Sequence, residues 1–275
     1  MDSRPVAVID SGIGGLPYLA WLRERLPCET LVYVADRRNF PYGEKTPAQV
    51  QAAVAEVAQR LQDECDPKLL VVACNTASVL ALEHLRTVFP GPVVGVVPAV
   101  KTAATVTRIG RIGVLATQRT IDGGYLEQLL EEFCPGKLVA TWAAPDLVAL
   151  VENDFLQPDP DNKAVLLGSW ANTIREQGAD TVVLGCTHFL YVTQELSRLL
   201  GSGVVLLDSR DGVGRRVIKL LLERGLEAKS PGESRLYFTS GRHWNSQELM
   251  EQERKYRHFA LQFGLSYGGP WSDRS

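Results

Sequence analysis

Residues 69–76 read LLVVACNT, an apolar run of strand length that ends at Cys74. The same order returns at residues 181–188, which read TVVLGCTH and end their apolar run at Cys186. A helix-like stretch follows each run, so each thiol is predicted at the carboxyl end of a strand and near the start of a helix. Open α/β sheets bind ligands at that edge, and a helix start favours a thiolate over a thiol. Two cysteines in matching settings predict one site with two like groups facing each other.

The two halves of the chain share an order of parts around these cysteines. Cys74 and Cys186 lie 112 positions apart, and the next apolar run begins 19 residues after the first cysteine and 18 after the second. Alternating strands and helices predict parallel sheets with right-handed crossovers. The expected fold class is therefore α/β, with two similar, mainly parallel domains related by a pseudo-twofold axis and the active site in the cleft between them. We assign residues 1–98 plus 210–275 to the first α/β domain and 99–209 to the second.

Composition excludes several classes of protein. The 275 residues are 45% hydrophobic and 22% charged, which is ordinary for a globular protein. The formal net charge of -3 argues against nucleic acid or an anionic membrane as a partner of the whole molecule. No apolar run reaches the length that spans a membrane.

The two ends of the chain carry weaker signals. Met1–Pro5 lead into the first strand without a signal-peptide pattern, so the expected location is the cytoplasm. Residues 236–239 are expected to form an edge strand, and residues 243–275 have no pattern that places them.

The five cysteines are too few and too scattered for a disulfide framework. With no CxxC or HxxxH pair, the sequence predicts no metal site, and no lysine stands in a pyridoxal phosphate motif. We therefore expect no cofactor. Cys28, Cys65 and Cys134 lack the neighbours that Cys74 and Cys186 share, and are interpreted as structural.

Two turns stand ahead of predicted helices. Residues 10–15, DSGIGG, can form an anion-holding loop with a carboxylate beside it, or a tight turn in which Asp10 and Ser11 are caps; the spacing leaves these two interpretations even. Residues 41–43, PYG, precede a helix whose start, TPAQ at 46–49, carries a capping box and an early proline. For this second turn, ordinary turn chemistry is the simpler interpretation.

Polar residues also follow other apolar runs. Thr117 follows the strand expected at 112–116, and Thr120 lies three residues later. Glu152 ends an apolar run, a position where most glutamates are solvated. A histidine such as His188 is more often structural than catalytic, but its place two residues after Cys186 would let it set the protonation of that thiol.

Two opposed thiols can invert a stereocentre. One thiolate removes a proton from carbon while a thiol on the other face returns one, a task that suits groups whose pKa lies near the working pH. An amino-acid Cα–H is a weak acid, so fixed N–H donors would have to stabilise the charge that develops on the carboxylate. Against this, a cysteine after an apolar strand is often a small core residue. For two cysteines in matched settings, the structural and catalytic interpretations stand about even.

Four motifs together resemble those of the glutamate racemases, within the cofactor-independent aspartate/glutamate racemases: residues 10–16, 41–43, 73–78 and 185–188. The resemblance implies a two-domain α/β fold and an isomerase, an amino-acid racemase that interconverts L- and D-glutamate without a cofactor. It implies that the product supplies D-glutamate for peptidoglycan biosynthesis, and so for cell wall biogenesis and cell shape. It also implies a cytoplasmic homodimer whose partner is the small-molecule substrate, with no nucleic acid and no membrane.

The resemblance further assigns roles to residues. It makes Cys74 the base that takes the proton from D-glutamate and Cys186 the base for L-glutamate. Asp10 resembles the partner of Cys74, and His188 and Glu152 resemble the partners of Cys186. Positions matching substrate contacts are Asp10, Ser11, Pro41, Tyr42, Gly43, Cys74, Asn75, Thr76, Thr117, Thr120, Cys186, Thr187 and His188.

Two other hypotheses remain open at this point. The same scaffold can racemise aspartate or another acidic amino acid, because a difference of one methylene is weakly specified by sequence. A binding or regulatory protein could keep the fold without the chemistry, in which case a ligand would stabilise it thermally with no proton exchange.

Overall fold

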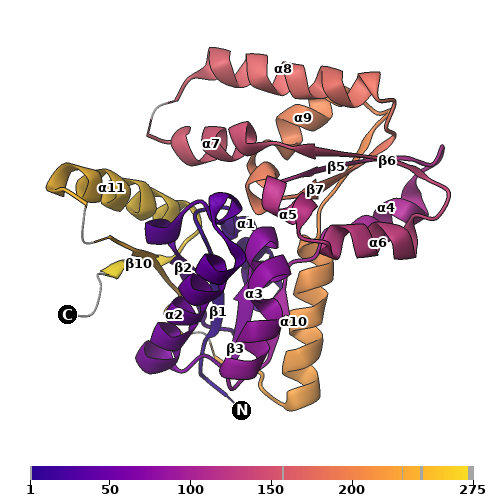
Figure 1. Ribbon diagram of the computed structural model, residues 1–275. Helices are drawn as coiled ribbons and strands as arrows, with labels where there is room; N and C mark the ends of the chain where they lie inside the picture. The colour runs from indigo at the N-terminus through magenta and orange to yellow at the C-terminus, as the bar shows by residue number, and fades with distance from the viewer. Residues whose placement is uncertain (1, 157, 231, 242–243, 272–275) are drawn as a thin grey trace. The chain divides into compact units, whose positions relative to one another are not determined.

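The computed structural model describes residues 2–156, 158–230, 232–241 and 244–271. Contacts within the chain divide it into two compact units, Met1–Val96 with Arg210–Ser275, and Val97–Ser209. Each unit contains one sheet of parallel strands with helices packed against it, as the alternation of strands and helices in the sequence predicts (Figure 1).

The first unit is built on a six-stranded sheet in the order β10-β9-β2-β1-β3-β4, and all its neighbouring strands run parallel. The strands are β1 Val6–Asp10, β2 Leu31–Ala35, β3 Leu69–Val72, β4 Val93–Gly95, β9 Arg235–Thr239 and β10 Ser266–Trp271. The central strands β1, β2 and β3 are buried along their whole length. This is why they appear in the sequence as continuous apolar runs rather than as alternating patterns.

Helices of the first unit sit on this sheet. They are α1 Leu16–Arg25, α2 Pro47–Cys65, α3 Asn75–Val88, α10 Arg210–Arg224 and α11 Ser246–Gln262. Helices α2 and α3 lie side by side (Figure 1), and their apolar residues share one buried cluster with Ala7, Ile9 and other residues of one sheet face. Helix α10 packs on α1, and α11 packs on β9 and β10.

Residues 236–239 form a strand as predicted, but the prediction that this strand lies at the sheet edge is wrong. Strand β9 lies between β2 and β10, and the edge is β10, from the stretch that the sequence pattern did not place. Gly268, Gly269 and Pro270 interrupt the apolar pattern of β10, and its pairing register shifts at Tyr267/Gly269. Proline within a sheet is confined to edge strands, first residues of strands and bulges, and glycine in a strand often marks a bulge, so this segment is hard to recognise in the sequence and suited to an edge.

The second unit holds a four-stranded parallel sheet in the order β6-β5-β7-β8. Its strands are β5 Arg111–Ala116, β6 Leu138–Ala143, β7 Thr181–Gly185 and β8 Val205–Leu207. Its helices are α4 Val100–Val106, α5 Gln118–Asp122, α6 Tyr125–Phe133, α7 Pro145–Asn153, α8 Pro160–Glu176 and α9 Thr193–Leu200. Residues of α4 and α6 form a buried cluster with one face of β5, and α8 packs on α9.

The two sheets repeat one topology. In each unit the first strand is central, the second strand pairs on one side of it, and the third and fourth follow on the other, so β1, β2, β3 and β4 correspond to β5, β6, β7 and β8. The order of neighbours reverses between β1 and β3 and again between β5 and β7. In open α/β sheets, ligands bind beyond the carboxyl ends of the strands at such a reversal. Asp10 and Cys74 flank the reversal in the first unit, and Thr117 and Cys186 flank it in the second.

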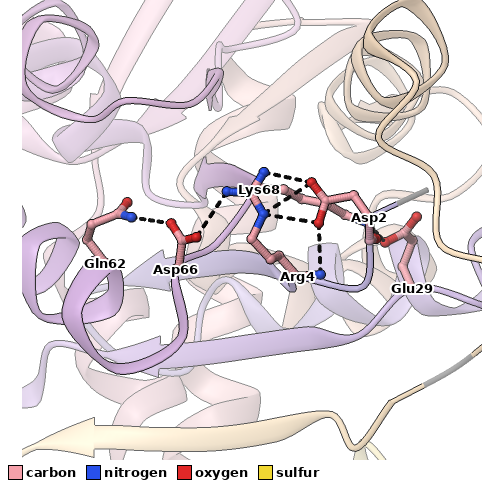
Figure 2. A network of polar contacts seen from close by, with 6 residues as sticks. All are labelled: Asp2, Arg4, Glu29, Gln62, Asp66 and Lys68. Carbon is pink, nitrogen blue, oxygen red and sulfur yellow. Dashed lines mark hydrogen bonds and ion pairs between the residues drawn. The ribbon is translucent and has the colours of Figure 1, made fainter.

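At the opposite, amino-terminal edge of the first sheet, polar side chains tie distant parts of the chain together (Figure 2). Lys68 forms a buried ion pair with Glu29 at 2.6 Å and donates to the backbone oxygen of Asp2 at 2.7 Å. Glu29 in turn accepts the amide of Ala228 at 2.8 Å. Arg4 bridges Asp2 and Asp66 on the surface. The buried pair therefore joins the first residues, the starts of β2 and β3, and the segment after α10.

Among the described residues, no helix combines the length and the apolar character that crossing a bilayer would require.

Candidate active site

Cys74 stands where β3 passes into α3. The amide of Ala73 still donates to Ile9 in β1, at 2.7 Å, and Cys74 then becomes the residue before the first helical residue, with φ -140° and ψ 122°. Its thiol is buried, with a relative exposure of 7%. Asp10 ends the adjacent strand β1, is 1% exposed, and accepts the amide of Gly12 at 2.8 Å. The thiol and the carboxylate thus stand on neighbouring strands of one sheet edge.

The side chain of Tyr33 in β2 supports the glycine-rich turn after β1 through two hydrogen bonds. The hydroxyl of this fully buried tyrosine donates to the carbonyl of Gly12 at 2.8 Å and accepts the amide of Gly15 at 3.2 Å. A Cβ at Gly15 would lie 2.8 Å from the Cβ of Ala73, so only glycine fits there. Ser11, in the same turn, is buried as well. The turn is therefore fixed in place. No side chain caps the start of α1, and Asp10 accepts the amide of Gly12 within the turn.

The turn at Pro41–Gly43 has one buried member. Tyr42 is 3% exposed and belongs to the same buried cluster as Cys74. Its hydroxyl donates to the carboxylate of Asp36 at 2.6 Å. Burial, followed by the Asp36 charge, raises the pKa of Tyr42 well above its ordinary value, and the charges of Cys74 and Asp10 add to the shift. Behind the turn, α2 begins with the predicted capping box of Thr46 and Gln49.

Asn75 and Thr76, the first two residues of α3, are both 2% exposed. The Nδ2 and Oδ1 atoms of Asn75 are buried, and neither makes a hydrogen bond within the part of the chain that the structure describes. Leaving a buried amide unsatisfied costs about 1–3 kcal/mol, and native proteins rarely tolerate it without a reason. A polar ligand beside Cys74 would provide the missing partners.

Cys186 repeats the setting of Cys74 in the second unit. It follows β7 with φ -140° and ψ 136° and is 6% exposed. The sequence pattern places a helix only from residue 192 onward, and the structure adds a 3-10 turn, η3 Thr187–Tyr191, ahead of α9. Thr187 and His188 are buried in this turn. The two cysteines therefore share backbone conformation and burial.

His188 links Cys186 to Glu152. Its Nδ1 lies 3.8 Å from the Cys186 sulfur, and its Nε2 is 2.8 Å from Oε1 of Glu152. Burial opposes the charged imidazolium, but the hydrogen bonds and charges of Cys186 and Glu152 outweigh it and raise the pKa of His188 to about 10. The raised pKa favours the imidazolium form of His188 at neutral pH, in an ion pair with Glu152. The sequence pattern favours a solvated Glu152, whereas this side chain is 1% exposed on α7.

The two threonines after β5 lie at the same sheet edge as Cys186. Thr117 is the N-cap of α5: its hydroxyl accepts the amide of Thr120 at 3.2 Å and lies 3.0 Å from the Thr120 hydroxyl. Thr120 is fully buried. Their described contacts are capping contacts, so their match to substrate positions stays a prediction.

Each unit therefore brings together its own share of the predicted residues. Asp10, Ser11, Tyr42, Cys74, Asn75 and Thr76 gather at one sheet edge, and Thr117, Thr120, Glu152, Cys186, Thr187 and His188 gather at the other. Sequence reasoning missed Asp36 and Tyr33, which support the first group. The available signal for Asp36 was its place directly after a buried strand, as for Asp10.

Comparisons with known proteins show the family to which the chain belongs. The family model described as Asp/Glu/Hydantoin racemase matches residues 18–211. The chain is 42% identical over 226 residues to the glutamate racemase of Roseiflexus sp., covering 82% of each chain.

Among solved structures, it resembles Escherichia coli glutamate racemase in complex with L-glutamate and the activator UDP-MurNAc-Ala, with a TM-score of 0.85, 31% identity, and coverage of 99% of this chain and 100% of that one. It also resembles the Francisella tularensis enzyme in complex with D-glutamate, with a TM-score of 0.77, 25% identity, and coverage of 100% and 98%. The chain therefore belongs to the Asp/Glu/hydantoin racemase family and, within it, to the glutamate racemases, which are isomerases.

Proposed function

We propose that this protein interconverts L- and D-glutamate by two-base proton transfer at Cα, with the sulfurs of Cys74 and Cys186 as the two bases. The observation that supports the proposal is the match between the local structures around the two cysteines. Two buried cysteines with nearly the same backbone conformation stand at corresponding points of two sheets with one topology. Relatives solved with L-glutamate and with D-glutamate support glutamate as the substrate.

In the proposed reaction, the thiolate of Cys74 takes the α-proton of D-glutamate, and the thiol of Cys186 gives a proton to the opposite face. One C–H bond breaks and one forms, no electrons leave the substrate, and the two sulfurs exchange protonation states. The reverse direction starts with Cys186 as the thiolate. The mechanism requires the two sulfurs to address opposite faces of one α-carbon, and it needs no metal or cofactor to balance.

The supporting groups are proposed to act on each sulfur separately. Asp10 is the partner of Cys74, on the adjacent strand. The His188 imidazolium, held by Glu152, faces the Cys186 sulfur and stabilises negative charge there. Substrate contacts are assigned to Ser11, Pro41, Tyr42, Gly43, Asn75, Thr76, Thr117, Thr120 and Thr187. The buried, unsatisfied amide of Asn75 supports a polar ligand at this edge.

The test is exchange of the α-proton. Purified protein without added cofactor is incubated with either enantiomer of glutamate in deuterated water. We expect deuterium at Cα and convergence of the circular dichroism signals of both enantiomers to zero. Absence of exchange from both enantiomers would reject the proposal, and ligand-induced thermal stabilisation without exchange would favour a binding protein instead. Aspartate serves as the comparison substrate, because it lacks one methylene of glutamate and such a difference changes kcat/KM by only about 10–200-fold. The faster of the two substrates identifies the acidic amino acid on which the protein acts.

We further propose that the activity supplies D-glutamate for peptidoglycan in the cytoplasm, and that the protein acts as a homodimer. Membership of the glutamate racemases supports the first point. Growth of a D-glutamate-requiring bacterial strain that expresses this chain tests it, with the Cys74→Ala variant as the negative control. Light scattering during gel filtration gives the number of subunits directly.

A further inference from the structure

Asp36 is a fully buried carboxylate at the sheet edge that carries Asp10 and Cys74. It follows the last residue of β2, and its amide donates to the backbone oxygen of Asp10 at 2.7 Å. The strand ladder is thereby extended one residue beyond β2. Asp36 thus lies beside Asp10 at the carboxyl ends of β2 and β1. The glycine-rich turn follows β1, and the loop that leads to Tyr42 follows β2.

Three neighbours donate hydrogen bonds to this carboxylate. The Tyr42 hydroxyl reaches Oδ2 at 2.6 Å, and the Thr239 hydroxyl reaches Oδ1 at 2.7 Å. The side-chain nitrogen Nδ2 of Asn39 lies 3.0 Å from Oδ2 of Asp36 and 3.2 Å from Oδ1. Burial raises the pKa of Asp36, while these donors oppose the shift. A buried carboxylate with several donors is stable only while all of them stay in place, so it holds its neighbours to one arrangement.

The network connects three separate segments. Thr239 is the last residue of β9, and its hydroxyl also accepts the amide of Arg38 at 3.0 Å. Asn39 lies in the short turn η1 Arg37–Asn39, and Tyr42 begins the turn η2 Tyr42–Glu44. Asp36 therefore anchors both ends of the loop that runs from β2 to η2, and it anchors this loop to the sheet.

The bond to Asp36 also determines which part of Tyr42 can meet a ligand. The hydroxyl is occupied by Asp36, and the ring is buried in the cluster that contains Cys74. Beyond it, the amides of Glu44 and Lys45 donate to the carbonyls of Pro41 and Tyr42, at 3.3 Å and 3.2 Å. The phenol thus serves as an anchor, and the backbone of the turn is left as the part that a substrate would contact.

We propose that Asp36 is a positioning residue for glutamate binding, which holds the Pro41–Gly43 turn in register with Cys74 and Asp10. The proposal rests on the proposed function, because it assigns Asp36 a share in binding that reaction's substrate. Asp36 does not contact the reacting atoms. Its loss should therefore loosen substrate binding more than it slows proton transfer, since misplacing a binding element by about 1 Å can cost up to about 100-fold.

Two variants separate this role from simple stabilisation. Asp36→Asn keeps the shape of the side chain but replaces one acceptor oxygen by a donor, and Tyr42→Phe keeps the ring but removes the hydroxyl. We expect each to raise KM for glutamate about 10-fold, with kcat within about 3-fold of the unmodified protein, because a loss of binding that precedes chemistry appears in KM. Because both weaken the same contact between Asp36 and Tyr42, the double variant should raise KM no further than the more severe single variant.

Glu29→Gln is the matched control. It alters another buried carboxylate of the same unit, one that pairs with Lys68 at the opposite edge of the sheet (Figure 2). It should lower the urea midpoint of unfolding while leaving KM within 2-fold. An unchanged KM in Asp36→Asn, or an equal rise in KM in Glu29→Gln, would overturn the positioning role.

Hydrogen exchange gives a readout that does not depend on catalysis. The amides of Glu44 and Lys45 should exchange at least about 10-fold faster in Asp36→Asn than in the unmodified protein, and at an unchanged rate in Glu29→Gln. Unchanged exchange in Asp36→Asn overturns the anchoring of the turn, whether or not the protein is active. Absence of racemisation by the unmodified protein rejects the proposed function instead, so the two failures are distinguishable.

Discussion

Cys74 and Cys186, the two proposed bases, have matching local settings in their two units. Both follow a buried strand, both have φ -140°, and both are nearly inaccessible to solvent. Their neighbours differ: the carboxylate of Asp10 ends the strand adjacent to Cys74, whereas the Cys186 sulfur lies 3.8 Å from Nδ1 of His188. The matched geometry is therefore a property of the backbone, and the chemical difference between the two sulfurs comes from their neighbours.

Replacing either sulfur should stop racemisation. We expect Cys74→Ala and Cys186→Ala each to lower turnover from both enantiomers at least about 100-fold, because each face of the α-carbon needs its own acid or base. Cys134→Ala is the matched control, since it removes another buried thiol from the core of the second unit. Circular dichroism of D- and L-glutamate over time measures the rates. Full activity in either of the first two variants would contradict the two-base mechanism.

The charge state of His188 has a measurable consequence. With the pKa raised to about 10, its imidazole resonance should titrate near that value rather than near 6.5; loss of the signal in His188→Asn assigns it. Since the folded state binds this proton more tightly than the unfolded state, the contribution to stability is complete below about pH 6.5. It is lost as pH rises from there through about 10. An NMR titration midpoint near 6.5 would show that Glu152 and Cys186 do not hold the cation.

At the scale of elements, the segment from β2 to α2 combines local and distant control. The Thr46 hydroxyl accepts the amide of Gln49, and the Gln49 side chain accepts the amide of Thr46, so the start of α2 is fixed by two residues three positions apart. The turn ahead of it is fixed by Asp36 and by Thr239, which is far away in sequence. The capping box was predictable from the sequence for this reason, and the anchoring network was not.

Removal of the cap should lower stability by a modest amount. We expect Thr46→Ala to lower the free energy of unfolding by about 1 kcal/mol, because the amide of Gln49 loses its acceptor. Thr46→Ser keeps the hydroxyl and should stay close to the unmodified protein. Urea unfolding followed by far-ultraviolet circular dichroism measures both. Equal stability of the alanine and serine variants would show that the cap contributes nothing.

At the scale of the whole chain, the first unit is completed by residues from both ends. The segment Arg210–Ser275 adds α10, β9, α11 and β10 to a sheet begun by Val6–Asp10. The buried pair of Lys68 and Glu29 lies where these segments meet, because Asp2 and Ala228 bond to it. The pair connects the beginning of the chain to its last quarter.

Breaking that pair should be costly. Lys68→Met leaves Glu29 buried without its cation, and we expect a loss of about 3–5 kcal/mol in the free energy of unfolding. The double variant Lys68→Met with Glu29→Leu removes both charges and should recover a large part of the loss. Arg4→Met, which breaks only exposed ion pairs, should cost no more than about 1 kcal/mol. If Lys68→Met and Arg4→Met had equal free energies of unfolding, the buried ion pair would contribute no more to stability than the exposed ones.

The sequence by itself determined the central strands of both sheets, the starts of several helices, the repeat, and the places of the two cysteines at strand ends, because each depends on neighbouring residues and on the periodicity of apolar side chains. Only the tertiary structure decided that Glu152 is buried against His188, that β10 rather than β9 is the sheet edge, and that Asp36 holds the Tyr42 turn. The cited partners of Glu152 and Asp36 lie 6 to 203 positions away along the chain. The folded chain alone brings such partners together, since no local pattern records which distant donor a buried carboxylate will meet.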